Sequence, residues 1–223
     1  RTDRSNSASS AAAASKKYPA ARLKINSAWI HPMRIVAGRH RGRLIDAPEG
    51  NDIRPTSDRV RESVFNILEH RNWGPGGLSV VSGARIFDGF CGTGALGLEA
   101  LSRGGAHVTF MDKNRAALDL CRRNLDTLGE RSSADVLQGD CLKPVRPAVP
   151  CELILLDPPY KADLAAPALS ALRDAGWLAA GAICAVETEA AGEPEFPEDF
   201  DKLDSRKYGA ARVHFLRYRD TTG

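Results

Sequence analysis

The sequence predicts a parallel, doubly wound α/β sheet preceded by a small β-hairpin. Three observations lead to this prediction. Short apolar strands alternate with segments of helical period between residues 84 and 188. Four of these strands run into a turn that holds an acid, as expected where ligands bind at the carboxyl ends of strands. No run of about 18 apolar residues suits a membrane span.

The length and charge of the chain indicate one main domain with a basic front end. Its 223 residues suffice for one core and a small appendage. The segment up to Arg43 carries ten Lys and Arg and one acid, whereas the rest carries 21 Lys and Arg and 27 acids. This asymmetry favours a polyanionic partner, although a solvated basic tail would have the same composition.

The five cysteines indicate reduced thiols. They form no CxxC pair and have no nearby His at ligand spacing, which argues against a zinc site or a disulfide framework. We therefore expect no metal.

Residues 1–32 are predicted to be a disordered basic extension, because they are rich in Ser, Ala and basic residues and have no sustained apolar period. Their composition is compatible with an upstream translated extension, a cloning remnant or part of an organelle transit peptide. We expect a cytoplasmic protein, and this segment leaves organelle import open.

Residues 33–56 are predicted to form the hairpin and a following loop. Two short strands flank a turn rich in Gly and Arg, and the loop ends near Pro55. A helix then begins near Ser57, with Asp58 in its first turn. The main α/β domain is expected to span residues 57–223.

The remaining elements follow from the apolar period. Strands are expected at residues 84–88, 106–112, 134–140, 152–157 and 182–188, and helices at 94–104, 114–129 and about 162–175. Segments 201–209 and 211–219 are expected to form an antiparallel pair at one edge of the sheet.

Glycines open the first strand-to-helix turn, in the stretch DGFCGTGALGLEA. Gly92, Gly94 and Gly97 match the pattern GxGxxG, in which missing side chains let backbone N–H groups approach a ligand. Asp112 ends the next strand, where a carboxylate can accept hydrogen bonds from both hydroxyls of a ribose. Together these residues indicate a cofactor that contains adenosine.

Asp88 distinguishes between two such cofactors. It closes the first strand four residues before Gly92, where a dinucleotide-binding loop usually has its first glycine. An acid there suits a cationic amine rather than a pyrophosphate, which favours S-adenosylmethionine over NAD. In the third turn, Asp140 and the backbone N–H of Cys141 are candidates for binding the amino group and ring nitrogen of adenine.

The fourth turn lies in the stretch LILLDPPY. Leu153–Leu156 suit a buried strand. The Asp157 carboxylate and the Pro158 carbonyl could accept both N–H bonds of a nucleobase amino group and draw its nitrogen toward tetrahedral geometry. Pro158 and Pro159 fix that carbonyl through their restricted φ, and Tyr160 offers a ring on which a base can stack. These four residues are the candidate catalytic residues for amine methylation.

In these motifs the chain resembles class I S-adenosylmethionine-dependent methyltransferases that modify exocyclic amino groups. The segment MRIVAGRHRGRLIDAPEGNDIRPTSDRVRESVFNIL narrows the resemblance to bacterial 16S ribosomal RNA guanine-N2 methyltransferases of the RsmD type. The resemblance covers about Met33 to Tyr218. Two features depart from it: Cys91 stands where a small residue such as Ala is expected, and residues 1–32 lie outside the pattern.

The resemblance implies a Rossmann-like, seven-stranded class I methyltransferase sheet with an N-terminal β-hairpin extension. It implies methyl transfer from S-adenosylmethionine to N2 of one guanine in 16S ribosomal RNA, guanine 966 in the usual numbering, within the small subunit or an assembly intermediate. It places Asp88, Gly92 and Gly94 at the methionine end of the cofactor, Asp112 at the ribose, Asp140 at the adenine and Asp157 to Tyr160 at the target amine.

Arginines in and near the hairpin favour RNA as the partner. Together they could neutralise several phosphates without reading sequence, although each alone could form a surface ion pair. The hairpin holds Arg34, Arg39, Arg41 and Arg43, and Arg54, Arg59 and Arg61 lie nearby in sequence. The main candidates for RNA binding are Arg39, Arg41, Arg43, Arg54 and Arg59. We expect a monomer.

Three alternatives remain open at this stage. A DNA adenine-N6 or cytosine-N4 methyltransferase would use the same tetrapeptide, although such enzymes usually need an added recognition domain. An NAD-dependent oxidoreductase would use the glycine loop and Asp112. A non-catalytic RNA-binding module would use the arginines but not the DPPY motif.

Overall fold

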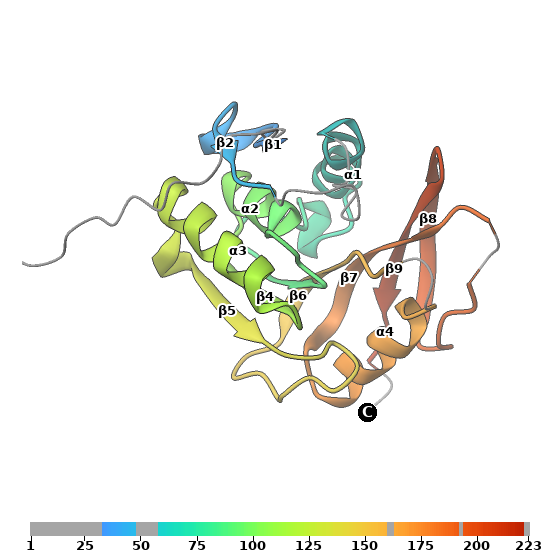
Figure 1. The fold of residues 1–223 in the computed structure, drawn as a ribbon. Helices are drawn as coiled ribbons and strands as arrows, with labels where there is room; N and C mark the ends of the chain where they lie inside the picture. Colours follow the sequence, from blue (N-terminus) through green and yellow to red (C-terminus); the bar gives the residue numbers. More distant parts are fainter. Residues whose placement is uncertain (1–32, 48–57, 160–162, 192–193, 221–223) are drawn as a thin grey trace, which may run out of the picture.

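The computed structural model describes residues 33–47, 58–159, 163–191 and 194–220. Its largest element is a seven-stranded sheet in the order β5-β4-β3-β6-β7-β9-β8 (Figure 1). The parallel strands are β3 (Arg85–Gly89), β4 (His107–Asp112), β5 (Ala134–Gln138), β6 (Cys151–Leu156) and β7 (Leu178–Glu189). The antiparallel strands β8 (Phe200–Tyr208) and β9 (Ala211–Tyr218) complete it at one edge. The extension at residues 1–32 lies outside the described residues.

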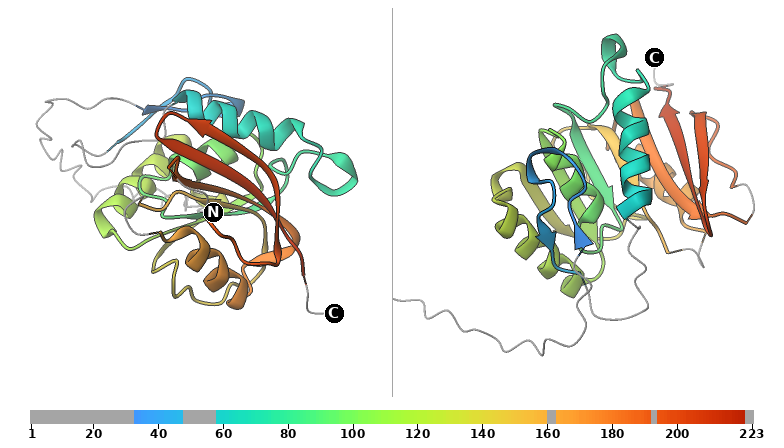
Figure 2. Two further views of the ribbon diagram at one scale, coloured as in Figure 1. Left: turned by 90° about the vertical axis from the view of Figure 1, so that its right-hand side faces the viewer. Right: turned by 90° about the horizontal axis from the view of Figure 1, so that it is seen from above.

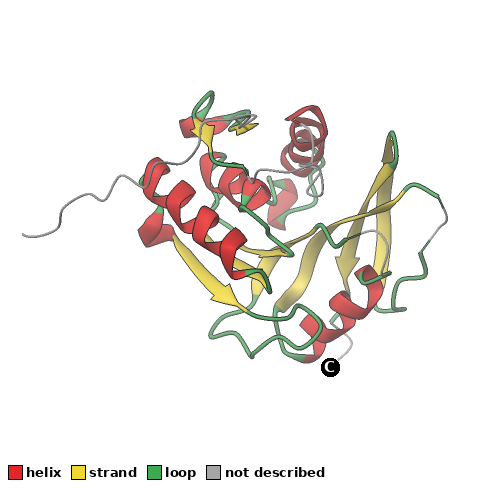
Figure 3. Ribbon diagram, in the orientation of Figure 1, coloured by secondary structure: helices red, strands yellow, loops and turns green. Residues whose placement is uncertain are grey.

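Helices cover both faces of this sheet (Figure 3). The helices α1 (Asp58–His70), α2 (Ala95–Ser102) and α3 (Arg115–Leu128) share one buried core with the first face. The helix α4 (Ala165–Asp174) packs in a second core against the other face. The predicted doubly wound α/β architecture is therefore confirmed.

Local sequence signals account for the helix α3. The side chain of Asn114 caps its start by accepting hydrogen bonds from the backbone N–H groups of Ala116 and Ala117. Gly129 ends the helix with a φ of 76°, a left-handed conformation that glycine adopts without steric cost. These caps set where the chain re-enters the sheet as β5.

The predicted N-terminal hairpin is present and packs onto the main core. Its strands β1 (Met33–Arg34) and β2 (Leu44–Ile45) pair antiparallel around the short 3-10 helix η1 (Gly38–His40). The side chains of Met33, Ile35 and Ile45 are buried in the core that α1 and α2 share. Figure 2 shows the hairpin beside α1 over the same face of the sheet.

Two boundaries differ from the sequence prediction by three residues or more. β7 begins at Leu178 rather than residue 182, because its pairing with β6 continues across a register shift between Cys151 and Leu153. α4 begins at Ala165, later than predicted, and residues 160–162 lie outside the described part of the chain. Within the described residues, no helix is long and apolar enough to cross a membrane.

Candidate functional site

The carboxyl ends of three neighbouring strands bring together three of the predicted site residues. Asp112 ends β4, Asp88 lies near the end of β3, and Asp157 directly follows β6. Residues two positions earlier on each strand, Phe110, Ile86 and Leu155, are buried in the core beneath α1, α2 and α3. Because side chains alternate along a strand, the three acids belong to that same face of the sheet.

Burial and the two neighbouring acids change the pKa of Asp88. Its side chain is 1% exposed, and its Oδ2 accepts a hydrogen bond of 2.8 Å from the backbone N–H of Gly97. Burial, together with the negative charges of Asp157 and Asp112, raises the pKa of Asp88 from 3.8 to about 8, even though the Gly97 bond acts to lower it. A cation bound among these carboxylates would be stabilised, as a ligand with a sulfonium and an ammonium group requires.

The turn after β3 and the first turn of α2 hold three glycines with two different physical roles. A Cβ on Gly97 would lie 2.3 Å from the Phe110 ring, and a Cβ on Gly94 would lie 2.7 Å from the Cys121 sulfur. These two glycines therefore let α2 pack closely on β4 and α3. Gly92, at φ +53°, has nothing within 4 Å of a built Cβ. Of the three, Gly92 is the one that leaves open space for a ligand.

Asp112 fits the predicted contact with a ribose. Its Oδ2 accepts a hydrogen bond from Gly92 N–H at 2.9 Å, and its Oδ1 accepts one from Asn114 N–H at 2.8 Å. Each carboxylate oxygen can accept a further bond, and the residue is only partly buried. The two backbone bonds fix the carboxylate and leave it able to accept from two hydroxyls.

Asp140 and Cys141 lie in the turn after β5. Partial burial acts to raise the pKa of Asp140, but the Leu142 N–H bond and the Lys113 ammonium, 3.0 Å away, hold it below its ordinary value. Burial raises the pKa of the Cys141 thiol to about 12. The thiol is therefore protonated, and the predicted role of Cys141 rests on its backbone N–H alone. The adenine contacts stay predictions.

The stretch Leu153–Leu156 is a fully buried strand, as predicted. Beyond it, Asp157 N–H lies 3.5 Å from the Gly89 carbonyl oxygen, which ties the start of the tetrapeptide to the end of β3. Pro158 is buried and Pro159 is exposed, whereas Tyr160 lies outside the described residues. Both prolines line a pocket of about 280 Å³. The pocket also borders the start of α4 and the end of β7.

The five arginines predicted to bind RNA differ in their contacts. Arg39 forms a two-pronged ion pair with Glu130, with both N–O distances 2.7 Å, and Arg43 donates to the Leu128 and Thr127 carbonyls at the end of α3. Arg39, Arg41, Arg43 and Arg59 are all exposed, and Arg54 lies outside the described residues. Contacts of these five residues with RNA stay predictions.

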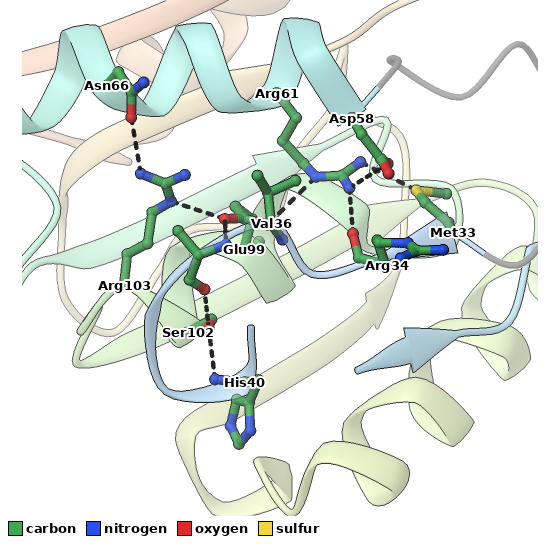
Figure 4. A network of polar contacts seen from close by, with 12 residues as sticks. Met33, Arg34, Val36, His40, Asp58, Arg61, Asn66, Glu99, Ser102 and Arg103 are labelled. Atoms are coloured by element: carbon green, nitrogen blue, oxygen red, sulfur yellow. Dashed lines mark hydrogen bonds and ion pairs between the residues drawn. The ribbon is translucent and has the colours of Figure 1, made fainter. Parts of the chain in front are cut away.

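Arg61 corrects the sequence interpretation. Its side chain is 0% exposed, donates to the Arg34 carbonyl at 2.6 Å and lies 3.4 Å from the Glu99 carboxylate (Figure 4). The expectation that Arg61 neutralises a phosphate is therefore wrong, because its charge is held inside the fold.

Glu99 is the centre of this buried network, and the sequence analysis did not identify it. Its carboxylate accepts hydrogen bonds from the backbone N–H groups of Val36 at 2.8 Å and Ala37 at 2.9 Å, and from Arg103 at 2.8 Å (Figure 4). It thereby ties the hairpin to α2, the helix that follows the glycine turn. A lone acid in an otherwise apolar helix, GALGLEALS, was the available signal.

Glu187 is a second residue of the site that the sequence analysis did not identify. It lies near the end of β7, it is 8% exposed, and it lines the pocket beside Pro158 and Pro159. Its sequence signal is the same as that of Asp157, an acid that follows an apolar strand, here AICAVE. Within the described residues, no group of three or more His, Cys, Asp or Glu side chains is arranged to hold a metal ion.

Comparisons with known proteins give a consistent result. The family model described as conserved hypothetical protein 95 matches residues 33–217. Ribosomal RNA small subunit methyltransferase D of Escherichia coli (strain K12) is 34% identical over 202 residues, 90% of this chain and 96% of that protein.

Solved structures agree with the sequence matches. The Escherichia coli protein yhhF is 33% identical, with a TM-score of 0.72 over 84% of this chain and 98% of that one. An RNA methyltransferase of Salinibacter ruber, solved in complex with S-adenosyl-L-homocysteine, shares the fold at 12% identity, with a TM-score of 0.55 over 76% and 97% of the two chains.

Proposed function

Since the chain belongs to the family described as conserved hypothetical protein 95, together with the small-subunit ribosomal RNA methyltransferases D, we propose that it methylates N2 of a guanine in 16S ribosomal RNA. The observation that carries the proposal is the juxtaposition of Asp157-Pro158-Pro159 with Asp88 and Asp112 at neighbouring strand ends. One part of this site suits a cationic adenosine cofactor, and the other suits an amino group.

S-adenosylmethionine fits the first part. When bound, it supplies a methyl group on a positively charged sulfonium. Asp112 would hold the ribose hydroxyls, and the exposed side of the turn at Gly92 would face the cofactor. Asp88 lies below this turn, where a bound cation would favour its carboxylate form, and a direct contact with the cofactor stays a prediction. Asp140 and the Cys141 N–H would bind the adenine.

Asp157 and Pro158 act on the target amine. The lone pair of a guanine N2 is delocalised into the ring, which makes the amino group a poor nucleophile. Hydrogen bonds from its two N–H groups to the Asp157 carboxylate and the Pro158 carbonyl would localise that lone pair and aim it. Asp157 could then hold the proton that N2 gives up once it carries the methyl group. Tyr160 would stack on the base.

The RNA partner would contact the hairpin side of the molecule. Arg41 and Arg59 are exposed and could contact phosphates, with Arg39, Arg43 and Arg54 as further candidates. We propose the small ribosomal subunit or an assembly intermediate as the substrate, a cytoplasmic enzyme and a monomer. The hairpin and loop at residues 33–56 would serve RNA contact, and residues 57–223 would form the methyltransferase domain.

Binding and turnover of the Asp157→Ala variant test the catalytic assignment. Asp157 is placed at the amine and not at the ribose, so calorimetric affinity for S-adenosylhomocysteine should stay within about threefold of wild type. Methyl transfer to small subunits should fall by at least about 100-fold. Asp112→Ala is the matched comparison, and there the cofactor affinity should fall. Full activity in Asp157→Ala would refute the assignment.

A further inference from the structure

A pocket of about 280 Å³ lies against Pro158 and Pro159 of the candidate catalytic tetrapeptide. Its walls include Pro158 and Pro159 after β6, residues 163–165 at the start of α4, and Glu187, Thr188 and Glu189 at the end of β7. Its volume is at the lower end of small-molecule sites, which suits a single nucleobase rather than a whole nucleotide. None of the cofactor contacts proposed above occupies it.

Glu187 is the neighbour of Asp157 across the sheet. The parallel strands β6 and β7 pair in the register Leu155 with Ala185 and Leu156 with Val186, so Asp157 and Glu187 occupy the next position. Leu155 and Ala185 are both buried in the core beneath α1, α2 and α3. Asp157 and Glu187 therefore belong to the same face. Glu187 lines the pocket, and Asp157 directly precedes Pro158, which also lines it.

The Watson–Crick edge of guanine carries adjacent N–H donors at N1 and N2. Adenine at N1 and cytosine at N3 present a bare acceptor beside their amino group instead. A carboxylate next to that position accepts from guanine and repels the other two bases, so it can discriminate by charge and hydrogen bonding rather than by size. Asp157 alone lacks this property, because it would contact only the amino group, which all three bases carry.

We propose that Glu187 is the residue that selects guanine, by accepting a hydrogen bond from N1–H while Asp157 and Pro158 hold the N2 amino group. This inference rests on the proposed function and adds the choice of base to it. A site built around a hydrogen bond from N1–H leaves a buried carboxylate without that bond when the base lacks the proton. Glu187 as a residue is only 8% exposed, so solvent would compensate such a loss poorly.

The test compares guanine with 2-aminopurine at the methylated position of reconstituted small subunits. 2-Aminopurine keeps the 2-amino group but has an unprotonated N1. We expect wild type to prefer guanine by at least about 100-fold in kcat/KM. In Glu187→Gln the amide can donate to the bare N1, so this preference should shrink at least tenfold. Affinity for S-adenosylhomocysteine should match that of wild type.

Glu195→Gln is the matched control, because Glu195 is exposed in the loop after β7 and does not line the pocket. Its guanine preference should equal that of wild type. An unchanged preference in Glu187→Gln would overturn the inference, even if its overall rate fell, because a merely structural role lowers both rates together. If the wild-type protein adds no methyl group to the guanine of these subunits, both the proposed function and this inference are overturned.

Discussion

The hairpin side of the molecule and the strand ends surround their buried carboxylates with groups of opposite charge. Glu99, under the hairpin, is surrounded by two arginines and two backbone N–H groups, so its charge is balanced inside the fold. Asp88, under the glycine turn, has Asp157 and Asp112 as the neighbours that help raise its pKa. The first arrangement stabilises the architecture, whereas the second leaves the charges of Asp112 and Asp157 to be balanced by what binds there, with Asp88 protonated beneath them.

Removal of the balanced carboxylate should have the largest effect. Glu99→Ala leaves Arg61 and Arg103 buried without their shared partner and frees the hairpin backbone. Breaking a buried ion pair from one side typically costs about 3–5 kcal/mol, so we expect a loss of that order in the free energy of unfolding. Urea unfolding measures it. Glu62→Ala, at an exposed position of α1, is the control and should change stability by less than about 0.5 kcal/mol.

The carboxylate at the strand ends should instead make stability depend on pH. The unfolded chain loses the Asp88 proton near pH 3.8, whereas the folded chain keeps it up to about pH 8. The folded state therefore binds more protons in between, and the stability contributed by this group falls as pH rises from about 4 to about 8. Each pKa unit corresponds to about 1.4 kcal/mol, so the total can reach several kcal/mol.

Asp88→Asn tests this sign. The amide oxygen can still accept from Gly97 N–H, but the side chain no longer titrates. Unfolding free energies of wild type and variant, measured from pH 5 to pH 8, should show a downward slope in wild type that is reduced in the variant. Parallel curves would show that Asp88 does not titrate in this range.

Substitutions at Gly97 and Gly92 should separate an effect on packing from an effect on cofactor binding. Gly97→Ala would place a Cβ 2.3 Å from the Phe110 ring, so we expect a loss of about 1–3 kcal/mol in stability. In Gly92→Ala the added Cβ has free space, so the loss in stability should be only about 1 kcal/mol, which comes from the positive φ. The same substitution should weaken cofactor binding at least tenfold. Denaturant unfolding and calorimetry on both variants measure the two quantities. The opposite pattern would reverse the assignment of the two glycines.

Among the exposed cations we expect the smallest effects. Arg41→Ala removes a charge that faces solvent, so it should weaken RNA binding and reduce the slope of log K against log salt by about 1. Arg39→Ala mainly releases Glu130, so we expect less than about 1 kcal/mol in stability and a smaller change in the salt slope. Salt titrations of RNA binding compare the two variants, and equal slopes would show that the Glu130 ion pair does not set Arg39 apart.

The sequence predicts this molecule well where a signal is local. Alternating apolar segments predict the strands and helices, and an acid at the end of an apolar strand identifies Asp88, Asp112 and Asp157. Non-local partners are invisible to such patterns. Glu99 meets Val36 across 63 residues, so neither its burial nor that of Arg61 follows from the segments that contain them. The position of Glu187 beside Asp157 follows only from the pairing of β7 with β6.

Methylation of small subunits that lack their native modifications tests the central claim most directly. The wild-type protein would be incubated with these subunits and labelled S-adenosylmethionine, and the labelled nucleotide would be identified by digestion and mass spectrometry. We predict one labelled nucleotide in 16S ribosomal RNA, N2-methylguanine, and a rate of labelling at least about 100-fold lower with Asp157→Ala. A label on adenine or cytosine, or on DNA offered in competition, would contradict the account.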